Sequence, residues 1–489
     1  MRVVLFALNG SYSHTCLALR CLRRPLEGAG FEVALLESNL RDRRDEVLQS
    51  LYVKRAEVYS FSCYIWNIEE TLSLAADLSA LLPSAKIIFG GPEVWYDSER
   101  FLQYDFIDCI VCGEGEDALV ALCKSIENSE DLPRVVNAEL PQVMGNEGIL
   151  YRDGDFHEGG MLYYESSRGC PYSCAYCLSS AQKGVRAKSV EAVLADMEAF
   201  EKLDSDIKII KFVDRTFNFD IARANRIWEA LLDEKYQKNY HFEICASLLD
   251  EQSFEIFKRF PKGKIQLEIG LQSTNEQTLA TVARQVSPSK VIEATRRIHD
   301  MGNIHVHLDL IAGLPYEGYE RFARSFDDAY DCSDMLQLGF LKLLHGTALR
   351  NDAEKYGYIS MAKAPYTVLA TNWMTRDEMY RLSMISDLLE RFYSSGRFSR
   401  SLGFAISKCD SPFAFYEGLL DHIAENDGRS VRKLSQTDAF RVFYSYVSTM
   451  LCGADLVEFE QNLHEDYAAH EARKMPYSVI HGNKKGLPV

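Results

Sequence analysis

The stretch SSRGCPYSCAYC, residues 166–177, contains three cysteines whose spacing decides how the rest of the chain is interpreted. Cys170, Cys174 and Cys177 are spaced Cys-x3-Cys-x2-Cys, and the neighbouring Gly169 and Pro171 favour a loop. A four-iron cluster takes four cysteine ligands in most proteins. With three, one iron keeps an open coordination position, the property that distinguishes a catalytic metal from a structural one. The spacing therefore predicts a catalytic iron–sulfur cluster.

Two other interpretations of these cysteines are a zinc site and buried free thiols. A structural zinc site needs a fourth ligand, which a second Cys/His pair usually supplies. The nearest histidines, His157 and His241, form no such pair. Buried free cysteines are common, but three of them within eight residues of a polar loop are not a core pattern.

The spacing, with the aromatic residue Tyr176 directly before the third cysteine, closely resembles the signature of radical S-adenosylmethionine (radical SAM) enzymes. The resemblance implies that the three cysteines are catalytic metal ligands and that the methionine end of SAM chelates the open iron. It also implies that the reduced 4Fe-4S cluster cleaves SAM to methionine and a 5′-deoxyadenosyl radical, which takes hydrogen from an unreactive C–H bond.

Length and composition indicate a large chain without a membrane span. Its 489 residues are enough for two or three domains. We expect no secretory signal, and no apolar run approaches the ~20 residues that a membrane span needs. The 13 cysteines are therefore expected in a cytoplasmic protein, as metal ligands or core residues rather than as disulfides. The net charge of −17 disfavours nucleic acid as a partner.

Residues 1–127 alternate short apolar runs with helical patterns. Repeated strand, helix, strand units predict an α/β fold, here a doubly wound, Rossmann-like parallel sheet with helices on both faces. Ligands of such sheets lie beyond the carboxyl ends of the strands. Ser62, Gly90, Gly91 and Gly113 lie at those ends, although tight turns alone also explain the glycines. The five predicted strands cover residues 2–8, 31–36, 58–62, 85–89 and 107–112.

This region resembles the cobalamin-binding domain that precedes many radical SAM domains. The likeness rests on its position and on two turns, Gly-Gly-Pro-Glu at 90–93 and Gly-Glu-Gly-Glu at 113–116. The resemblance implies that Ser62, Gly90, Gly91 and Gly113 line the nucleotide tail of cobalamin.

The Asp-x-His-x-x-Gly motif, which supplies a histidine to cobalt in other cobalamin proteins, is absent from this chain. His14, in the first loop, is interpreted as a loop or helix-start residue instead. The resemblance then places Tyr64 and Trp66, just past the third strand, in the wall under cobalt. Ordinary packing is the alternative for both aromatic residues.

Strands and helices alternate again in residues 161–350, after a polar, turn-rich segment at 128–160 that predicts a linker with one hairpin. The alternation resembles the partial (β/α)6 barrel of radical SAM enzymes. Functional groups of such barrels lie on the loops at the carboxyl ends of the strands. The six predicted strands cover residues 161–165, 207–213, 240–246, 265–271, 304–312 and 335–343.

Gln272 and Arg284 are twelve residues apart, like a Gln and an Arg that hold the methionine part of SAM in coproporphyrinogen-type radical SAM enzymes. The resemblance implies that Arg284 binds the SAM carboxylate, which suits its planar donor fork; a solvated helix position is the alternative. It also implies that Tyr176 stacks near adenine and that Gly313 leaves room beside the ribose or adenine. Asp214 occupies the position of the family's Gly-Gly-Glu motif, which contacts the SAM amino group, although the full motif is absent.

Residues 351–489 show helical periodicity. A capping box at Thr375–Glu378 predicts a helix through Phe392. Further helices are predicted at 440–451 and 464–474. The aromatic residues of this region are better explained as core residues than as the lining of a substrate-binding pocket.

Together the resemblances imply a cobalamin-dependent radical SAM C-methyltransferase with a 4Fe-4S cluster, S-adenosyl-L-methionine and cobalamin as cofactors. The 5′-deoxyadenosyl radical would activate an unactivated carbon, and methylcobalamin would methylate it. The substrate would be a peptide or protein, or a natural-product intermediate. An electron donor such as flavodoxin or ferredoxin is the expected partner.

Three alternatives stay open. The first keeps both cofactors but performs a non-methylating rearrangement or cyclisation. The second is a tRNA methylthiotransferase-like enzyme, which needs a second cluster; Cys63, Cys109 and Cys112 are available, but their neighbours do not match that family. The third is a non-enzymatic cobalamin or iron–sulfur sensor that never cleaves SAM.

Overall fold

The computed structural model describes residues 1–145, 148–155, 160–181, 184–203, 207–470, 475–476 and 479. The chain forms two compact units. Unit 1 comprises residues 1–267, 342–353 and 360–367, and unit 2 comprises residues 268–341, 354–359 and 368–489. The boundary between the units falls within strand β12 (Ile265–Gln272).

Unit 1 begins with a parallel sheet of six strands in the order β2-β1-β3-β4-β5-β6. The five predicted strands are present, and the doubly wound arrangement is confirmed. Because β1 lies between β2 and β3, the strand order reverses there, and such a switch point leaves a crevice at the carboxyl ends of the strands. The strands are β1 (Arg2–Asn9), β2 (Glu32–Asn39), β3 (Val58–Ser62), β4 (Lys86–Gly90), β5 (Cys109–Cys112) and β6 (Val135–Asn137).

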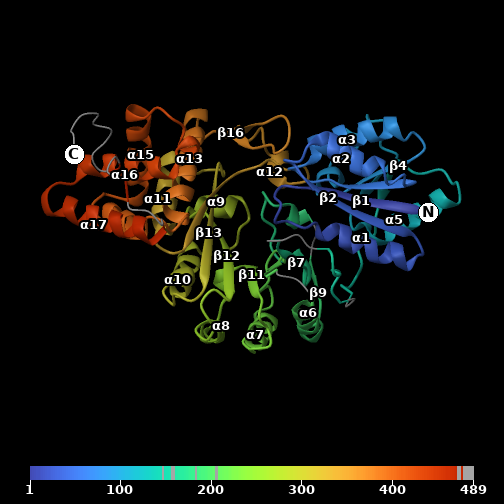
Figure 1. Cartoon of the computed structure of the whole chain (residues 1–489), viewed down its shortest axis with the longest axis horizontal. Helices are drawn as coiled ribbons and strands as arrows, with labels where there is room; N and C mark the ends of the chain where they lie inside the picture. Colours follow the sequence, from blue (N-terminus) through green and yellow to red (C-terminus); the bar gives the residue numbers. More distant parts are fainter. Residues whose placement is uncertain are drawn as a thin grey trace. The chain divides into compact units, whose positions relative to one another are not determined.

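Helices cover both faces of this sheet (Figure 1), and the alternation of side chains along β1 explains why. Val4 and Phe6 pack with α2 and α3, whereas Val3 and Leu5 pack with α1 and α5 on the opposite face. Both faces are therefore buried, which is why the strand reads as a continuous apolar run. The helices are α1 (Leu17–Gly28), α2 (Arg44–Tyr52), α3 (Ile68–Leu81), α4 (Pro92–Trp95) and α5 (Gly115–Glu127).

Part of the segment predicted as a linker with a hairpin extends the first sheet, and another part contacts helix α1. Strand β6 runs parallel to β5 at the edge of the sheet. Farther along, the Arg23 guanidinium donates to the Leu150 carbonyl across 2.8 Å and to Asp155 Oδ2 across 2.7 Å. The prediction missed these features because a three-residue edge strand among polar residues has no usable periodicity.

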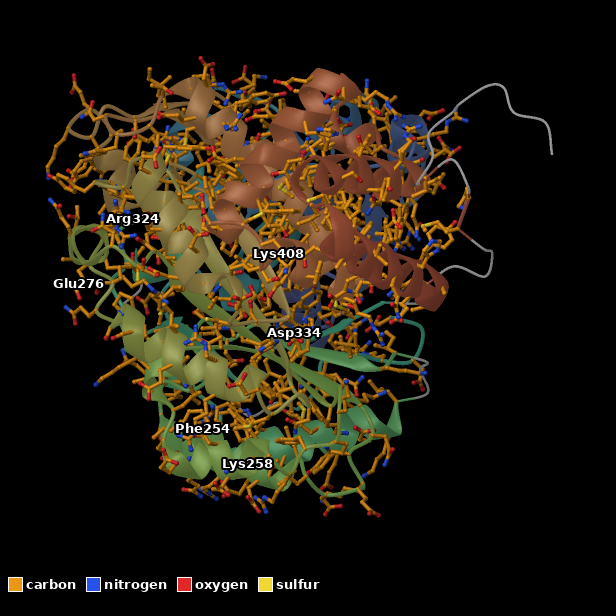
Figure 2. All side chains as sticks on the ribbon, turned by 90° about the vertical axis from the view of Figure 1, so that its left-hand side faces the viewer. Phe254, Lys258, Glu276, Arg324, Asp334 and Lys408 are labelled. Atoms are coloured by element: carbon orange, nitrogen blue, oxygen red, sulfur yellow. The ribbon has the colours of Figure 1, made fainter. Side chains whose placement is uncertain are left out.

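The remainder of unit 1 starts the second strand-and-helix repeat. Strands β7, β10 and β11 are parallel neighbours, and β8 and β9 form an antiparallel hairpin. On α8, Phe254 is buried, whereas Lys258, directly after the helix, is exposed (Figure 2). The elements are β7 (Leu162–Tyr164), β8 (Ser167–Cys170), β9 (Gly184–Ala187), α6 (Val190–Lys202), β10 (Ile209–Phe212), α7 (Ile221–Ala230), β11 (Asn239–Ile244), α8 (Glu251–Phe257) and α12 (Ala348–Asn351).

Unit 2 continues the repeat after β12, and β13 pairs in parallel with β14. All six predicted strands of the repeat are present in their expected order along the chain. The elements are α9 (Glu276–Thr281), α10 (Pro288–His299), β13 (His305–Ala312), α11 (Tyr319–Tyr330), β14 (Met335–Phe340), β15 (Ile359–Ser360) and β16 (Val368–Ala370).

The C-terminal region of unit 2 is helical, as predicted. The capping box is confirmed: Thr375 Oγ1 accepts from the Glu378 amide, and Glu378 Oε2 accepts from the Thr375 amide at 2.7 Å. Lys408, labelled in Figure 2, pairs with Asp455 of α17 across 2.9 Å. The last predicted helix starts earlier than expected, and residues 471–474 lie outside the described part of the chain. The helices are α13 (Arg376–Leu389), α14 (Ser399–Ile406), α15 (Pro412–Asn426), α16 (Gln436–Met450) and α17 (Gly453–His470).

Phenylalanines in and next to these helices form a buried core, including Phe398, Phe415 and Phe443. This placement agrees with their interpretation as core residues. Among the helices that the structure describes, none combines the length and apolar character needed to cross a membrane.

Candidate functional site

A cavity of about 680 Å³ opens at the carboxyl edge of the first sheet. Gly10 follows β1, and Ser62, Gly90 and Gly113 end or follow β3, β4 and β5, so the cavity lies at the switch point between β1 and β3. All six residues that the sequence assigns to cobalamin line this one cavity: Ser62, Tyr64, Trp66, Gly90, Gly91 and Gly113.

Two of these glycines are required by the backbone itself. Gly91 has φ of 110°, and a Cβ added there would lie 2.5 Å from the Cys63 carbonyl oxygen. Gly113 has φ of 104°, and its Cβ would lie 3.1 Å from the Ala138 carbonyl oxygen. The turns therefore need glycine, and the same turns leave the edge of the sheet open to a ligand.

Tyr64 and Trp66 form a stacked pair in the cavity wall, with ring centroids 4.4 Å apart and planes 7° apart. Trp66 is 51% exposed, whereas Tyr64 is partly buried against the core of the first sheet. Asn67, which the sequence did not single out, holds this loop: its amide donates to the Leu8 and Ser62 carbonyls, and its Oδ1 accepts from the Tyr64 amide at 2.8 Å. The signal available in the sequence was an Asn directly before the first residue of a helix.

His14 lines the same cavity, and its ring lies 5.9 Å from that of Tyr163. Burial and the nearby charge of Lys211 lower the pKa of His14 below its ordinary value. The imidazole is therefore neutral near pH 7 and sits in a loop, as the sequence indicated.

The cluster loop is held by the β8–β9 hairpin, in which Cys170 pairs with Gly184. Gly169 has φ of 93°, and a Cβ there would collide with the Gly184 carbonyl oxygen, so this position needs glycine. Cys170 Sγ lies 3.6 Å from Thr216 Oγ1, and the Cys177 amide donates to the Cys174 carbonyl at 3.0 Å. Burial raises the pKa of the Cys170 thiol above its ordinary value.

The spacing of the three thiols fits a cluster better than one zinc ion. Within the described residues, the one group of three Cys, His, Asp or Glu ligand atoms lying within 4.8 Å of one another is elsewhere in the chain. At least one pair of the three sulfurs is therefore farther apart than 4.8 Å, whereas tetrahedral zinc with Zn–S bonds of about 2.3 Å needs every pair at roughly 3.8 Å. A cluster distributes its cysteine ligands over several irons.

The cluster loop and the cavity share a wall. Gly169 and Leu178, the residues directly before Cys170 and directly after Cys177, both line the cavity, and so does Ser179. All these residues belong to unit 1. A ligand in the cavity would therefore lie beside the loop that presents the thiols.

In unit 2, the structure brings Gln272 and Arg284 together around Gly270. Arg284 Nη2 donates to the Gly270 carbonyl, and a Cβ on Gly270 would lie 3.2 Å from the same nitrogen and collide with the Gln272 amide. Gln272 adopts φ of 73°, rare for a residue with a side chain. Its Oε1 is buried without a hydrogen-bond partner among the described residues, which suits a polar ligand such as SAM.

The three further residues assigned to SAM have different surroundings in the structure. Asp214 is fully buried and accepts hydrogen bonds from the Ser166 amide at 3.0 Å and from the Ser166 and Ser167 hydroxyls. This network ties Asp214 to the segment that leads into the cysteine loop, and its predicted contact with the SAM amino group stays a prediction. Gly313, with φ of 94°, is packed by Met379, whose Cε would lie 3.3 Å from an added Cβ. Tyr176 is half-buried in the cluster loop.

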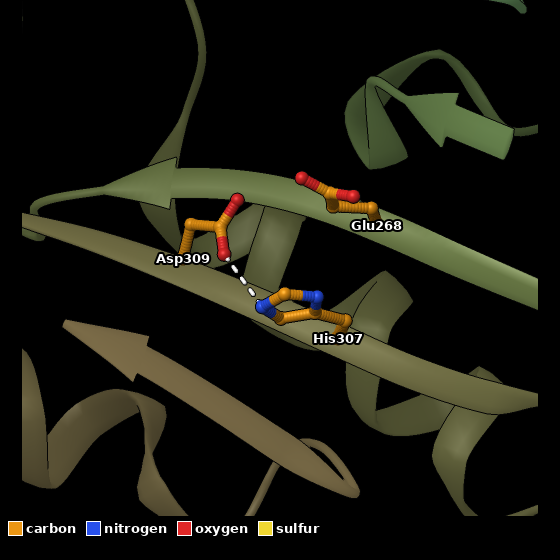
Figure 3. Close-up of side chains that lie close together, drawn as sticks. All are labelled: Glu268, His307 and Asp309. Atoms are coloured by element: carbon orange, nitrogen blue, oxygen red, sulfur yellow. Dashed lines mark ion pairs between the residues drawn. The ribbon is translucent and has the colours of Figure 1, made fainter. Parts of the chain in front are cut away.

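Glu268, His307 and Asp309 form a polar cluster on β12 and β13 (Figure 3). Their ligand atoms lie within 4.8 Å of one another, and His307 Nε2 is 2.9 Å from Asp309 Oδ1. This donor set has the residue types of a divalent-metal site. The sequence analysis did not single it out, although His307 and Asp309 are two residues apart on one strand and so share a face.

Cys63, Cys109 and Cys112 do not form a second cluster site. Cys63 and Cys112 are buried in the core on the α2–α3 face of the first sheet, and Cys109 is buried on the opposite face. Burial raises the pKa of all three thiols, that of Cys109 to about 11. This arrangement argues against the methylthiotransferase-like alternative.

Comparison with protein families assigns both halves of the site. Residues 4–123 match the family described as "B12 binding domain", and residues 164–329 match the "Radical SAM superfamily". The chain is a radical SAM protein with a B12-binding domain. Most residues that line the cavity belong to the first domain of this radical SAM protein, and the cysteine loop belongs to the second. Residues 354–486 match a "Protein of unknown function (DUF4080)".

Relatives of this radical SAM protein include two curated enzymes. The cobalamin-dependent radical SAM methyltransferase TokK of Streptomyces tokunonensis is 24% identical over 75% of this chain and 61% of its own length. The hopanoid C-3 methylase of Methylococcus capsulatus is 25% identical over 63% of this chain and 62% of its own length. The chain thus spans about three fifths of either relative.

A solved structure shares the fold of this radical SAM protein. The cobalamin-dependent S-adenosylmethionine radical enzyme OxsB, with aqua-cobalamin and SAM bound, superposes with a TM-score of 0.65 at 13% identity. The match covers 96% of this chain and 83% of OxsB. The cofactors expected from the sequence, cobalamin, a 4Fe-4S cluster and SAM, are those of these two domain families.

Proposed function

We propose that the protein is a cobalamin-dependent radical SAM C-methyltransferase that acts on an unactivated carbon. The observation that carries this proposal is the shared wall of the site. Gly169 and Leu178 flank the cluster cysteines and line the same cavity as Gly91 and Gly113 of the B12-binding domain. This arrangement supports chemistry in which a cobalt-bound methyl group and a SAM-derived radical act on one substrate.

When bound, the cofactors supply the radical that removes hydrogen and the methyl group that replaces it. The chain positions them. Cys170, Cys174 and Cys177 would hold the cluster and would leave one iron open for SAM. Arg284, with its planar donor fork, orients the SAM carboxylate beside Gln272.

Tyr64 and Trp66 face the cavity as a stacked aromatic pair rather than as metal ligands. Aromatic rings exclude water from the side of the cavity that they cover. We therefore assign them to the wall under cobalt, in place of the histidine that the chain lacks in the usual motif.

The relatives support methyl transfer as the reaction class. TokK and the hopanoid C-3 methylase are both named for it. We infer a natural-product intermediate or a peptide or protein side chain as the substrate. A flavodoxin or ferredoxin would supply the electrons.

The proposal is tested by loading the full chain anaerobically with iron, sulfide and hydroxocobalamin, followed by desalting. About four irons and one cobalamin per chain are expected. After addition of SAM and a reductant, both 5′-deoxyadenosine and S-adenosylhomocysteine should form, since the latter remains when SAM gives up a methyl group. The Cys174→Ala variant should form no 5′-deoxyadenosine.

Each other result supports a different function. Cobalamin retention and 5′-deoxyadenosine without S-adenosylhomocysteine would favour a non-methylating rearrangement or cyclisation. Retention of both cofactors without SAM cleavage would favour a sensor. Iron without cobalamin would remove methyl transfer from consideration.

A further inference from the structure

The cavity wall joins two parts of unit 1 that are far apart in sequence. One part is the turn Gly113–Glu116, which follows β5 of the B12-binding domain. The other is the β8–β9 hairpin, which carries Cys170 at its end. An ion-pair cluster connects them, and neither the sequence motifs nor the family comparisons assign it a role.

Glu114 is the centre of this cluster. Arg168 Nη1 donates to Glu114 Oε2 across 2.7 Å, and Arg186 Nη1 donates to the same oxygen across 3.2 Å. Arg186 Nη2 bonds to the other carboxylate oxygen. The Glu114 side chain is 12% exposed. Charge-assisted hydrogen bonds to a side chain with so little exposure to water are strong and directional.

The hairpin places the two arginines against each other, since Arg168 and Arg186 are directly opposed across β8 and β9. Like charges in this position repel. Arg168 has two further partners, Glu116 at 2.8 Å and Glu165 at 2.7 Å. Arg186 pairs with no acidic side chain other than Glu114 in the part of the chain that the structure describes. Glu114 is thus what holds β9 to the turn.

Each end of this ion-pair cluster lies next to the expected site of one cofactor. Glu114 lies between Gly113 and Gly115, which line the cavity, and the hairpin ends in the loop that presents the cysteines. Metal bound to those cysteines would restrict the loop that carries them and would thereby order the hairpin. An ordered hairpin would fix the position of Glu114 through Arg168 and Arg186. Glu114 would in turn fix the conformation of the turn Gly113–Glu116, which lines the cavity.

We propose that the Arg168–Glu114–Arg186 ion pairs couple cobalamin binding to assembly of the iron–sulfur cluster, with Glu114 as the positioning residue. This inference rests on the proposed function only in taking the cavity to be the cobalamin site. Coupling of this kind is reciprocal, so cobalamin strengthens retention of the cluster by the same factor. The protein thereby favours the state that holds both cofactors.

The test is the equilibrium affinity of the full chain for hydroxocobalamin, measured with the cluster reconstituted and with iron removed. In the wild-type protein the reconstituted form should bind about 5- to 150-fold more tightly, the usual range of coupling between sites. In Glu114→Gln the ratio of the two affinities should fall close to one, while iron content and the electron paramagnetic resonance signal of the reduced cluster persist.

Two variants complete the design. Arg186→Gln leaves Glu114 paired with Arg168, so folding is safeguarded, and it should also lower the ratio. Glu27→Gln is the matched control, because Glu27 forms a two-point pair with Arg152 in the same unit but does not line the cavity. Its ratio should equal that of the wild type.

An unchanged ratio in Glu114→Gln, or a wild-type ratio of one, would overturn the coupling while leaving the proposed function intact. Failure of both wild-type forms to bind hydroxocobalamin would instead overturn the proposed function, and the coupling with it.

Discussion

Arg284 donates a hydrogen bond to the carbonyl oxygen of Gly270, two residues before Gln272 on the same strand. The bond holds the guanidinium near the end of β12, beside Gln272, whose buried Oε1 has no hydrogen-bond partner among the described residues. Gln272 and Arg284, which the sequence relates only by their spacing, therefore lie close together. The Oε1 atom of Gln272 is available there to accept a hydrogen bond from a ligand.

Replacing Arg284 with alanine should weaken SAM binding without loss of the cluster. Removal of a charge-assisted hydrogen bond costs about 1.5–3 kcal/mol, which corresponds to a rise of about 10- to 150-fold in the SAM concentration needed for half-maximal 5′-deoxyadenosine formation. Iron content should stay the same. Arg324→Ala, an exposed arginine on α11 labelled in Figure 2, is the control. An unchanged SAM dependence in Arg284→Ala would assign this residue, which lies between α9 and α10, to holding the Gly270 carbonyl rather than SAM.

Replacing Cys174 with alanine should abolish the cluster and all SAM cleavage. Two thiols cannot retain a cluster that already has an open iron. Iron analysis after reconstitution and a 5′-deoxyadenosine assay measure the result. Cys452→Ala, which removes an exposed cysteine in unit 2, should match the wild type. Residual 5′-deoxyadenosine in Cys174→Ala would show that these cysteines are not the catalytic ligands.

Replacing Gly91 with alanine should destabilise the B12-binding domain by about 1–3 kcal/mol, because the positive φ and the contact with the Cys63 carbonyl both exclude a Cβ. Cobalamin retention should fall as well. The midpoint of urea unfolding measures the first effect. Gly28→Ala, at the end of α1 with no atom within 4 Å of the added Cβ, should change stability by at most about 1 kcal/mol. Equal stability of the two variants would contradict the strained turn.

His345 should make the protein less stable in acid. Its Nδ1 lies 2.8 Å from Asp97 Oδ2 and its Nε2 lies 3.2 Å from Arg100 Nη1. Burial and the charges of Arg350 and Arg100 lower its pKa from 6.5 to about 4. Since the unfolded state takes up a proton near pH 6.5 and the folded state does so only near pH 4, stability falls as the pH drops through this interval.

The expected slope from this one group is at most about 1.4 kcal/mol per pH unit. Urea unfolding of the wild type and of His345→Asn between pH 4 and pH 8 isolates it, because the carboxylates titrate in both proteins. The variant should be less stable at pH 7 and lose less stability in acid. Parallel pH profiles of the two proteins would contradict the depressed pKa.

Local patterns in the sequence identified most of the elements. Periods of two and of about 3.6 residues depend on near neighbours, so the six strands of the second repeat and the capping box at Thr375 were predicted correctly. Strand β6 was missed because three residues at a sheet edge have too little periodicity to detect. Its place depends on pairing with β5 instead.

The sequence by itself determined the chemistry of the cluster loop, since the spacing of Cys170, Cys174 and Cys177 is a local property of one hairpin. The tertiary structure alone decided what that loop touches. It placed Gly169 and Leu178 on the cavity of the B12-binding domain, engaged Asp214 with Ser166, and joined Glu114 to Arg168 and Arg186. Each of these contacts links residues separated by roughly 50 or more positions, or side chains whose direction follows from sheet register. Such contacts arise from packing of the whole chain, which no short stretch of sequence specifies.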